Sequence, residues 1–224
     1  MKLTIVAATG GIGRHILAQS LAAGHEVTAV VRNPARLDVE VNAVAVDLSS
    51  TDEAQAAALR DAVAGADAVL SGLGARTKAD HGVARRGTRA LIAAMDAVGT
   101  ARLVVVSAAP IGTVPSPARP NPPRYDEGDG FAMRHLLNPV VKRALRDHYA
   151  DLAAMEDELR ASRLAWTVVR PPRLTDKPHT GTYRTALGHN LRRGLTVSRA
   201  DVADLMLRTV GMPETERAVV GVAY

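Results

Sequence analysis

Tyr149 is the side chain of this sequence whose type most directly suggests acid catalysis, and it lies in the segment DHYADLAAMED at 147–157. A phenol with an ordinary pKa of ~10 donates a proton readily near neutral pH only when a nearby cation lowers that pKa. The residue four positions later is Ala153 rather than lysine, and the nearest basic residue downstream is Arg160. Apolar or aromatic residues at 145, 149, 152 and 159 form one stripe at helical spacing. We therefore expect Tyr149 to pack against a sheet, with its hydroxyl bonded to one partner.

Histidines are the other candidates for proton transfer or metal binding. His148 precedes Tyr149, and we expect it to be solvated on the flank of the helix. The remaining histidines show no paired spacing typical of metal ligands, and the sequence contains no cysteine. They are His15, His25, His81, His135, His179 and His189. We expect no metal site.

The segment AATGGIGRH at 7–15 places glycines where a strand is expected to be followed by a helix. Glycines there let a pyrophosphate approach the backbone, and the N–H groups and dipole at the helix start favour an anion. The turn therefore predicts a dinucleotide phosphate site, made by Thr9, Gly10, Gly11, Ile12 and Gly13. Residue 7 is Ala where a glycine is usual, and we expect Gly11 to absorb the strain if a positive φ is needed.

The end of the second expected strand distinguishes the two nicotinamide cofactors. NAD sites place a carboxylate there for the ribose 2′-hydroxyl, whereas VVRNPAR at 30–36 places Arg32 and Arg36 where a 2′-phosphate would lie. A guanidinium binds phosphate through a planar set of donors. We therefore expect NADPH rather than NADH, with Asp47 and Leu48 beside the adenine. Surface arginines without a ligand are the alternative.

Two further strand ends are expected to approach the cofactor. SGLGAR at 71–76 places Gly72, Leu73 and Gly74 where backbone passes close to it, although an ordinary turn would also explain these residues. Ser107 ends the fifth strand, at the edge where such sheets bind ligands. We expect its hydroxyl to contact the nicotinamide amide or the hydride acceptor. The alternative is a serine that bonds its own backbone.

Short apolar strands alternate with helices along most of the chain. Strands are expected at 2–7, 26–31, 42–47, 66–72, 102–107, 165–170, 195–198 and 218–223, and helices after the glycine turn and at 51–65, 82–99, 139–162 and 199–210. Thr51 and Gly65 are expected to cap the second helix. Strands rich in Val and Leu suit burial on both faces, and their alternation with helices predicts right-handed crossovers. The expected fold class is α/β, a doubly wound parallel sheet of Rossmann type.

Two long segments interrupt this alternation, at 108–138 and 171–195. The first carries six prolines between Pro110 and Pro123 and the acidic piece DEGDG, which makes it far too long for an ordinary connection. We expect both segments to be substrate-side loops, the first either a lid or a mobile excursion on the surface. No linker divides the chain, so we expect a single domain over 1–224 with a small C-terminal substrate-side region.

Composition limits the classes of partner. Hydrophobic residues make up 47% and charged residues 23%, as in ordinary soluble proteins. The net charge is +5, but basic residues are scattered and aromatics are only 3%, which favours a small anionic ligand over nucleic acid. No apolar run is long enough for a membrane span and no signal-peptide pattern is present, so we expect a cytoplasmic protein without a membrane partner. We expect a monomer or a weak homo-oligomer.

Motifs along nearly the whole chain also resemble those of one family. They are ATGGIG, GHEVTAVVRNPARL, GLGAR, GTRALIAAM, VVVSAA, DHYADLAAMEDELRASRLAWTVVRPPRLTDKPHTGTYR and SRADVADLML. The chain resembles atypical short-chain dehydrogenases/reductases of the NAD(P)H-binding, NmrA-like family, and most closely the biliverdin reductase B and flavin reductase group. This resemblance implies a single-domain NAD(P)H-binding fold, a shallow open pocket over the nicotinamide, and broad reduction of flavins or planar pigments.

The resemblance also implies roles for individual residues. It places Arg76 with Gly74 in the loop after the fourth strand, and Ala108 with Ser107 beside the nicotinamide. It makes Pro171 and Pro172 the wall behind the nicotinamide ring. The departure is at Arg173, where the flavin reductases have a histidine. An arginine cannot donate a proton near neutral pH, but it can pair with a phosphate or carboxylate of an anionic acceptor.

Together these features favour an NADPH-dependent oxidoreductase that transfers hydride to a flat conjugated acceptor, with Ser107 and Arg173 as its catalytic residues. A flavin or bilin spreads the new negative charge over its rings and can take its proton from water, so binding and orientation suffice. An NmrA-like protein that senses NADP(H) without catalysis is the alternative, because the Tyr-Lys pair of short-chain reductases is missing. A nucleotide-sugar epimerase or dehydratase is less favoured, since it needs that pair and a larger substrate domain.

Overall fold

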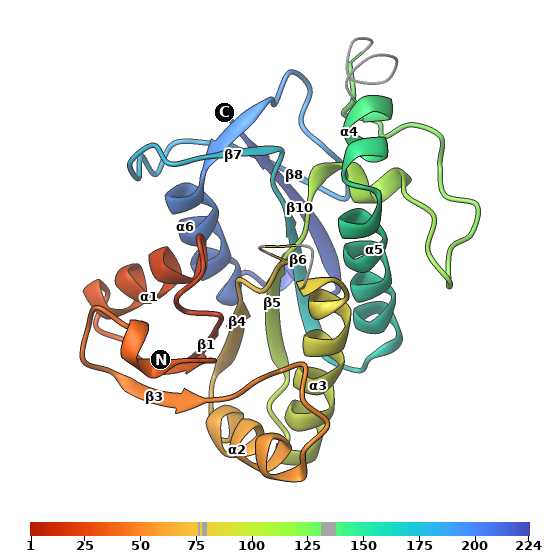
Figure 1. The fold of residues 1–224 in the computed structure, drawn as a ribbon. Coiled ribbons are helices and arrows are strands. Elements are labelled where there is room, and N and C mark those ends of the chain that lie inside the picture. Colours follow the sequence, from red (N-terminus) through yellow and green to blue (C-terminus); the bar gives the residue numbers. More distant parts are fainter. Residues whose placement is uncertain (76, 78–79, 131–137) are drawn as a thin grey trace.

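An eight-stranded sheet forms the centre of this computed structural model, with strand order β3-β2-β1-β4-β5-β6-β10-β8 (Figure 1). The strands are β1 (Lys2–Val6), β2 (Glu26–Val31), β3 (Asn42–Ala45), β4 (Ala68–Ser71), β5 (Arg102–Val106), β6 (Ala165–Arg170), β8 (Arg184–Leu187) and β10 (Ala218–Ala223). All neighbouring strands run parallel except β8, which pairs antiparallel with β10. A small second sheet pairs β7 (Arg173–Thr175) with β9 (Thr196–Ser198). The structure describes residues 1–75, 77, 80–130 and 138–224.

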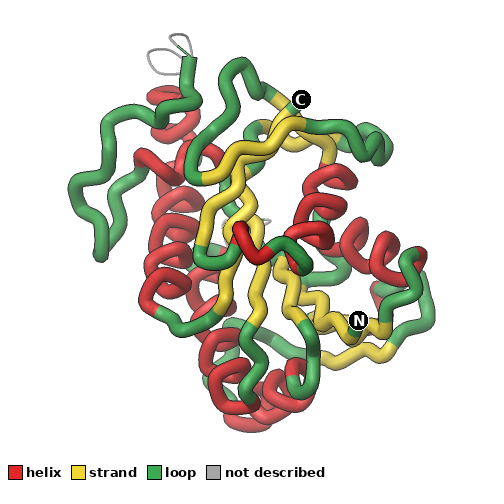
Figure 2. Tube along the Cα trace, turned by 180° about the vertical axis from the view of Figure 1, so that it is seen from behind, coloured by secondary structure: helices red, strands yellow, loops and turns green. Residues whose placement is uncertain are grey.

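Helices cover both faces of the sheet (Figures 1 and 2). They are α1 (Gly13–Ala22), α2 (Glu53–Val63), α3 (Val83–Val98), α4 (Asn138–Ala144), α5 (Arg146–Ala161) and α6 (Arg199–Val210). One half of the core lies between the sheet and α1 with α6, and the other between the sheet and α2, α3 and α5. Every residue of β4 and β5 is buried, as expected for strands covered on both faces.

The strand order confirms the α/β doubly wound fold predicted from the sequence. From β1 the chain proceeds outward through β2 to β3, and then returns to the other side of β1 to form β4, β5 and β6. Ligands of such sheets bind at the carboxyl ends of the strands, where the order reverses. The reversal lies between β1 and β4, so the glycine turn after β1 and the residues after β4 meet at this point.

The two regions around the substrate side differ from the predicted elements. The segment 171–184 is less irregular than expected, because it contains β7, and β8 follows it. The helix expected over 139–162 is two helices, since Leu145 between α4 and α5 has φ −111° and ψ 25°. Leu145 is 44% exposed, so its place on the apolar stripe was wrong. Strands β7 and β8 form by pairing with the distant strands β9 and β10, which the hydrophobic periodicity of a short segment does not show.

The caps of α2 also differ in detail. Asp52, not Thr51, is the N-cap, because its carboxylate accepts a hydrogen bond from the Ala54 N–H. The C-cap is Ala64, and Gly65 follows it with φ 67°. A glycine just beyond the C-cap is the usual way to leave a helix through the left-handed region.

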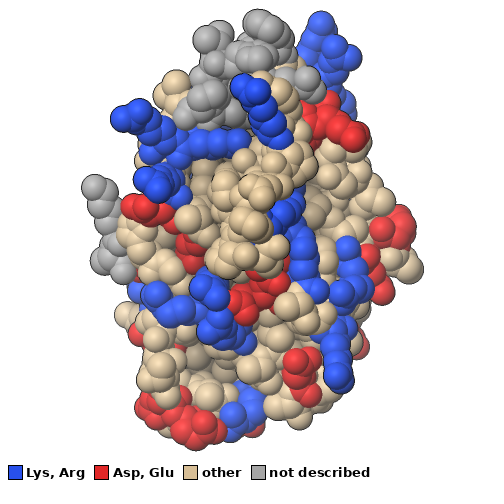
Figure 3. Space-filling model, turned by 90° about the vertical axis from the view of Figure 1, so that its right-hand side faces the viewer, with Lys and Arg blue, Asp and Glu red and all other residues tan. Residues whose placement is uncertain are grey.

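The surface carries mixed charge. On the face shown in Figure 3, Lys and Arg side chains are interleaved with Asp and Glu rather than gathered into one basic patch. Among the described residues, no helix is long and apolar enough to cross a membrane.

Candidate cofactor and acceptor site

Two adjoining cavities lie at the carboxyl ends of the strands. The β5-side cavity has a volume of about 550 Å³ and the β2-side cavity about 360 Å³. They share six lining residues from the glycine turn and from the segment after β4, namely Thr9, Gly10, Gly11, Gly72, Leu73 and Gly74. The two cavities therefore form one groove that passes over the point where the strand order reverses.

Glycines make the floor of this groove. A Cβ on Gly13 would lie 2.1 Å from the Ala7 carbonyl oxygen, and a Cβ on Gly72 would lie 2.9 Å from the Gly13 nitrogen. The backbone after β1 and the backbone after β4 are therefore in direct contact. The first N–H groups of α1 have no acceptor within the helix, and they begin at this turn. This arrangement is a cradle for a phosphate group.

Ala7 itself adopts the left-handed conformation, with φ 58°. The expectation that Gly11 absorbs this strain was wrong, because Gly11 does not have a positive φ. Gly11 instead leaves room for a guanidinium: a Cβ there would lie 3.0 Å from Arg199 Nε. A glycine at position 11 is therefore explained by the close approach of the Arg199 side chain, and not by a backbone conformation that only glycine adopts.

Arginines line the β2-side cavity. Arg32 and Arg36 line it as predicted, together with Asp47 and Leu48, and sequence analysis missed Arg86. Hydrogen bonds from Ser49 are the main cause that lowers the pKa of Asp47, and the positive charges of Arg32 and Arg86 add to it. Arg32 Nη1 lies 3.4 Å from Asp80 Oδ1. This end of the groove suits an anionic group flanked by a flat ring.

Ser107 lines the β5-side cavity. Its Oγ donates a hydrogen bond to Glu156 Oε1 at 2.8 Å, so it bonds a side chain of α5 rather than its own backbone. Because its hydrogen is engaged, Ser107 offers the cavity only the lone pairs of its oxygen. It can accept a hydrogen bond from an amide N–H of a ligand, but it is not poised to donate one.

Glu156 is fully buried and is held by two arginines. Arg170 Nε lies 2.9 Å from Oε1, and Arg160 Nη2 lies 2.5 Å from Oε2. Burial alone would raise the pKa of Glu156, but the charges and hydrogen bonds of these arginines outweigh it and hold the pKa below its usual value. The ionised carboxylate fixes Ser107 from behind.

Tyr149 is buried in the core on the α5 side of the sheet, which agrees with the packing predicted for it. Burial raises the pKa of its phenol, which makes it a poorer acid. His148, expected to be solvated on the helix flank, instead lines the β5-side cavity together with Leu152, one turn further along α5. Burial is the main cause that lowers the pKa of His148.

Other predicted residues are not brought to the groove. Arg173 is exposed on β7 and is not among the residues that line either cavity. Pro172 lines a separate small pocket, the Pro171 carbonyl accepts from the Ala109 N–H, and Ala108 packs on the core. Arg76 lies outside the described residues. Among the described residues, no group of three side chains could hold a metal ion.

A charged cluster that sequence analysis missed stands at the mouth of the β5-side cavity. Asp176 Oδ1 lies 2.8 Å from Arg199 Nη1 and 3.8 Å from Arg14 Nη2, and all three residues line the cavity. The sequence does carry a signal for Arg199. Ser198 and Asp201 form an S-x-x-D capping pattern, so Arg199 must be the first residue of a helix, next to the end of β9.

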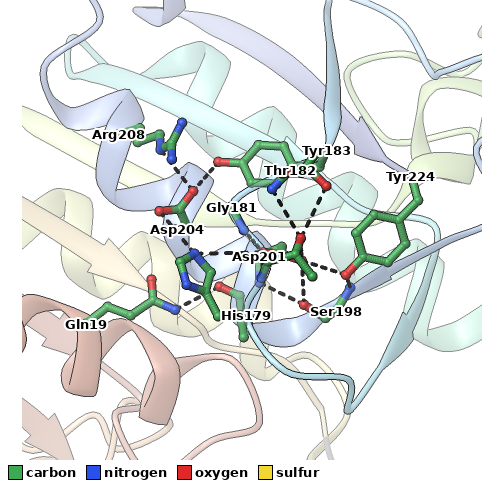
Figure 4. A network of polar contacts seen from close by, with 12 residues as sticks. Gln19, His179, Gly181, Thr182, Tyr183, Ser198, Asp201, Asp204, Arg208 and Tyr224 are labelled. Carbon is green, nitrogen blue, oxygen red and sulfur yellow. Dashed lines mark hydrogen bonds and ion pairs between the residues drawn. The ribbon is translucent and has the colours of Figure 1, made fainter.

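Asp176 lines the wall of the cavity at this point, and Asp201 holds the segment that follows it in the chain at Thr180 and Gly181. Figure 4 shows the network around Asp201. This buried carboxylate accepts from the backbone N–H groups of Thr180 and Gly181 and from the hydroxyls of Thr180, Ser198 and Tyr224. Beside it, Tyr183 donates to Asp204, which also pairs with Arg208. The TDKPHTGTY motif is therefore tied to α6 and to the last residue of the chain.

The described part of the segment 108–138 does not cover the groove. It begins with a short 3₁₀ helix, Ala109–Thr113, in which Ile111 is fully buried. Further on, the Ser116 hydroxyl and the Ala118 N–H both donate to Asp157 of α5. None of its described residues lines either cavity of the groove. Its described residues thus bond to α5 through Ser116 and Ala118, and to Asn190 through Asp126 and Asp129.

Comparison with known proteins shows which family the chain matches. Residues 7–213 match the profile of a family described as NAD(P)H-binding. The UPF0659 protein YMR090W of Saccharomyces cerevisiae is 26% identical over 222 residues, which cover 95% of this chain and 88% of the yeast protein.

Solved structures share the fold. A short-chain dehydrogenase/reductase from Veillonella parvula, crystallised in complex with NADP, has a TM-score of 0.74 and 19% identity over 100% of this chain and 94% of its own. ChuY, an anaerobilin reductase from Escherichia coli O157:H7, has a TM-score of 0.75 and 20% identity over 100% of this chain and 97% of its own. These likenesses confirm the Rossmann-type architecture expected from the sequence.

Proposed function

This chain belongs to the NAD(P)H-binding family, and on that premise we propose that it is an NADPH-dependent reductase whose acceptor is a flat conjugated molecule of the flavin or bilin type. The observation that carries the proposal is the continuous groove. Its β2 end is lined by arginines, its middle is a glycine cradle, and its β5 end opens into the larger cavity beside Ser107.

The residues of the groove fit a phosphorylated dinucleotide. Gly13 and Gly72 let the turn after β1 pack directly on the backbone after β4, and Gly10 and Gly11 line the groove there without side chains that would obstruct a pyrophosphate. Arg32 and Arg36 provide guanidinium donors for a 2′-phosphate, and no carboxylate ends β2 where an NADH ribose would need one. When bound, NADPH would supply one hydride, which is a proton together with two electrons. The NADP complex of the Veillonella parvula protein is consistent with this assignment.

The chain's own residues bind and orient rather than perform acid catalysis on such an acceptor. Ser107 would accept a hydrogen bond from the nicotinamide amide, because its own hydrogen is donated to Glu156 and its lone pairs remain available. Leu152 and Leu174 give the β5-side cavity apolar surface for a flat ring. A conjugated acceptor takes its proton from water, so the buried position of Tyr149 does not prevent turnover.

Small anionic acceptors fit the proposal better than neutral ones. Arg14 and Arg199 line the cavity, and their charges help to lower the pKa of nearby His15, after burial as the largest cause. The proposal includes a cytoplasmic location and a chain that acts alone or as a weak homo-oligomer. Arg76, which the resemblance placed in the loop after the fourth strand, remains a predicted cofactor contact, whereas Arg173 lines neither cavity and is given no role in this proposal.

The test mixes the protein with NADPH and a panel containing FMN, riboflavin and a bilin, and follows the nicotinamide absorbance. We expect turnover with at least one flat acceptor, and faster turnover with NADPH than with NADH. Tight NADPH binding without turnover of any acceptor would contradict the proposal. That outcome would support a protein that senses NADP(H) without catalysis, which the burial of Tyr149 and the absence of a lysine at position 153 favour as the second candidate.

A further inference from the structure

Helix α5 is turned so that His148, and not Tyr149, lines the β5-side cavity. Tyr149, which precedes Ala153 by four residues, is buried among core residues on the α5 side of the sheet. His148 and Leu152, which are also four residues apart, line the β5-side cavity. The imidazole therefore stands on the same cavity wall as Leu152, facing the space that Ser107 also lines.

His148 is the one histidine among the described residues that line this cavity, and a neutral or protonated imidazole can donate a hydrogen bond there. Ser107 cannot serve as the donor, because its hydrogen is engaged by Glu156. Arg14 and Arg199 are permanent cations that cannot release a proton near neutral pH. Asp176 also lines the cavity, but its carboxylate pairs with Arg199 and Arg14, so His148 is the described lining side chain best suited to deliver a proton.

We propose that His148 is a catalytic proton donor that extends the reductase to a second class of acceptor, ketones and aldehydes, in which hydride transfer leaves the charge on one oxygen. This inference rests on the proposed NADPH-dependent reduction. A localised alkoxide gains far more from a positioned donor than a delocalised flavin anion does, by about 10²- to 10⁴-fold.

The step balances within the proposed cofactor chemistry. The C–H bond at C4 of the reduced nicotinamide breaks, and its electron pair forms a new C–H bond at the carbonyl carbon. The C=O π electrons move to the oxygen, which forms an O–H bond with the proton of the His148 imidazolium. The carbonyl is reduced to an alcohol, NADPH is oxidised to NADP⁺, and His148 regains a proton from water.

The groups around His148 set the pH dependence of this step. Burial lowers the pKa of His148 most, the Asp151 carboxylate opposes that shift and His81 adds to it. Asp151 is fixed by the N–H groups of Ala84 and Arg85 at the start of α3. Across the cavity stand the charged cluster of Asp176 with its two arginines and the Ser107 hydroxyl. The pKa of His148 is therefore lowered, so its imidazolium form becomes populated at a lower pH than that of an exposed histidine.

The experiment compares an α-keto ester with FMN as acceptors, both with saturating NADPH, between pH 5 and pH 8. For the wild type we expect kcat/KM for the keto ester to rise as the pH falls through a pKa below 6.5, with no such limb for FMN. The variant His148→Gln keeps a hydrogen-bond donor but cannot titrate. It should lose about 10²-fold or more with the keto ester, together with the rise in kcat/KM at low pH, and its loss with FMN should be at least about tenfold smaller than its loss with the keto ester. His25→Gln, far from the cavity and beside the N-terminus, is the matched control.

Each outcome decides the matter. The inference would be overturned if wild type and His148→Gln reduced the keto ester at equal rates and with equal pH profiles. It would also be overturned if the wild type reduced FMN but no keto ester. Neither result would contradict the proposed function. Failure of the wild type to reduce either acceptor would overturn both the inference and the proposed function.

The folding of the His148→Gln variant is checked by its binding of NADPH, followed through the fluorescence of the cofactor itself. If the variant does not fold, the pH profile of the wild type decides the matter. A rise of kcat/KM at low pH with the keto ester but not with FMN supports the inference, and the absence of that rise contradicts it.

Discussion

The hydroxyl of Ser107 and the carboxylate of Glu156 are joined by a hydrogen bond of 2.8 Å that links the end of β5 to the middle of α5. The carboxylate lies entirely out of solvent and also holds Arg170, whose side chain is 5% exposed. Strand β5, strand β6 and helix α5 are therefore connected behind the cavity by one ionised group.

Replacing this group should destabilise the fold strongly. Glu156→Gln leaves the buried Arg170 guanidinium without its countercharge, so we expect a loss of about 3–5 kcal/mol in the free energy of unfolding. Urea denaturation measures it. Glu158→Gln is the matched control on the same helix, because its partners Arg85 and Arg89 are more exposed, and it should cost at most about 1 kcal/mol. Equal losses in the two variants would show that Glu156 is not held as described.

The arginines after β2 should discriminate between the cofactors. Arg32→Ala and Arg36→Ala remove donors for a 2′-phosphate, so NADPH binding should weaken by about 1.5–3 kcal/mol, roughly 10- to 100-fold, while NADH binding stays the same. Fluorescence titration of each cofactor provides the measurement. Arg163→Ala, at an exposed position away from both cavities, should change neither affinity. A parallel loss of both affinities would argue against a phosphate contact.

The strained residue of the glycine turn should tolerate glycine. At φ 58°, Ala7 pays a steric cost that glycine does not, so Ala7→Gly should raise the free energy of unfolding by up to about 1 kcal/mol. Ala8→Gly, next to it but buried and without a positive φ, should instead lower stability. Thermal unfolding of the two variants distinguishes them. Destabilisation by both would mean that the methyl group of Ala7 matters more than its backbone.

Asp201 should make stability depend on acid pH. Burial alone would raise its pKa, but the hydrogen bonds it accepts from Tyr224, Thr180 and Gly181 lower it from 3.8 to about 2. Its contribution is therefore complete above pH 4 and is lost as the pH falls towards 2, amounting to about 2 kcal/mol. Calorimetry of the wild type and of Asp201→Asn across this range should show the acid loss in the wild type. The same slope in the variant would assign the loss to other carboxylates.

The sequence predicted the parallel sheet, and it singled out residues that the structure places along the β2-side cavity, because both depend on local features. Buried strands of Val and Leu, the glycine turn and the position of Arg32 after β2 are all written in short segments. The acceptor half depends on long-range packing. Half of the residues of α5 are buried, including the charged Asp151 and Glu156, so an apolar stripe could not show which side of the helix faces the cavity, and His148 was placed on the wrong side. Asp176 meets Arg199 and Arg14 only after three distant segments have folded together.

The five hydrogen bonds that Asp201 accepts also bear on how quickly the site exchanges its contents. The wall that carries Asp176 is anchored to a helix and to the chain's last residue, and the described part of 108–138 packs elsewhere. A fixed wall needs no hinge motion before an acceptor enters or a product leaves. On the side formed by the described residues 174–201, entry into the β5-side cavity therefore requires no movement of this wall, and ligands of very different outline could pass along it.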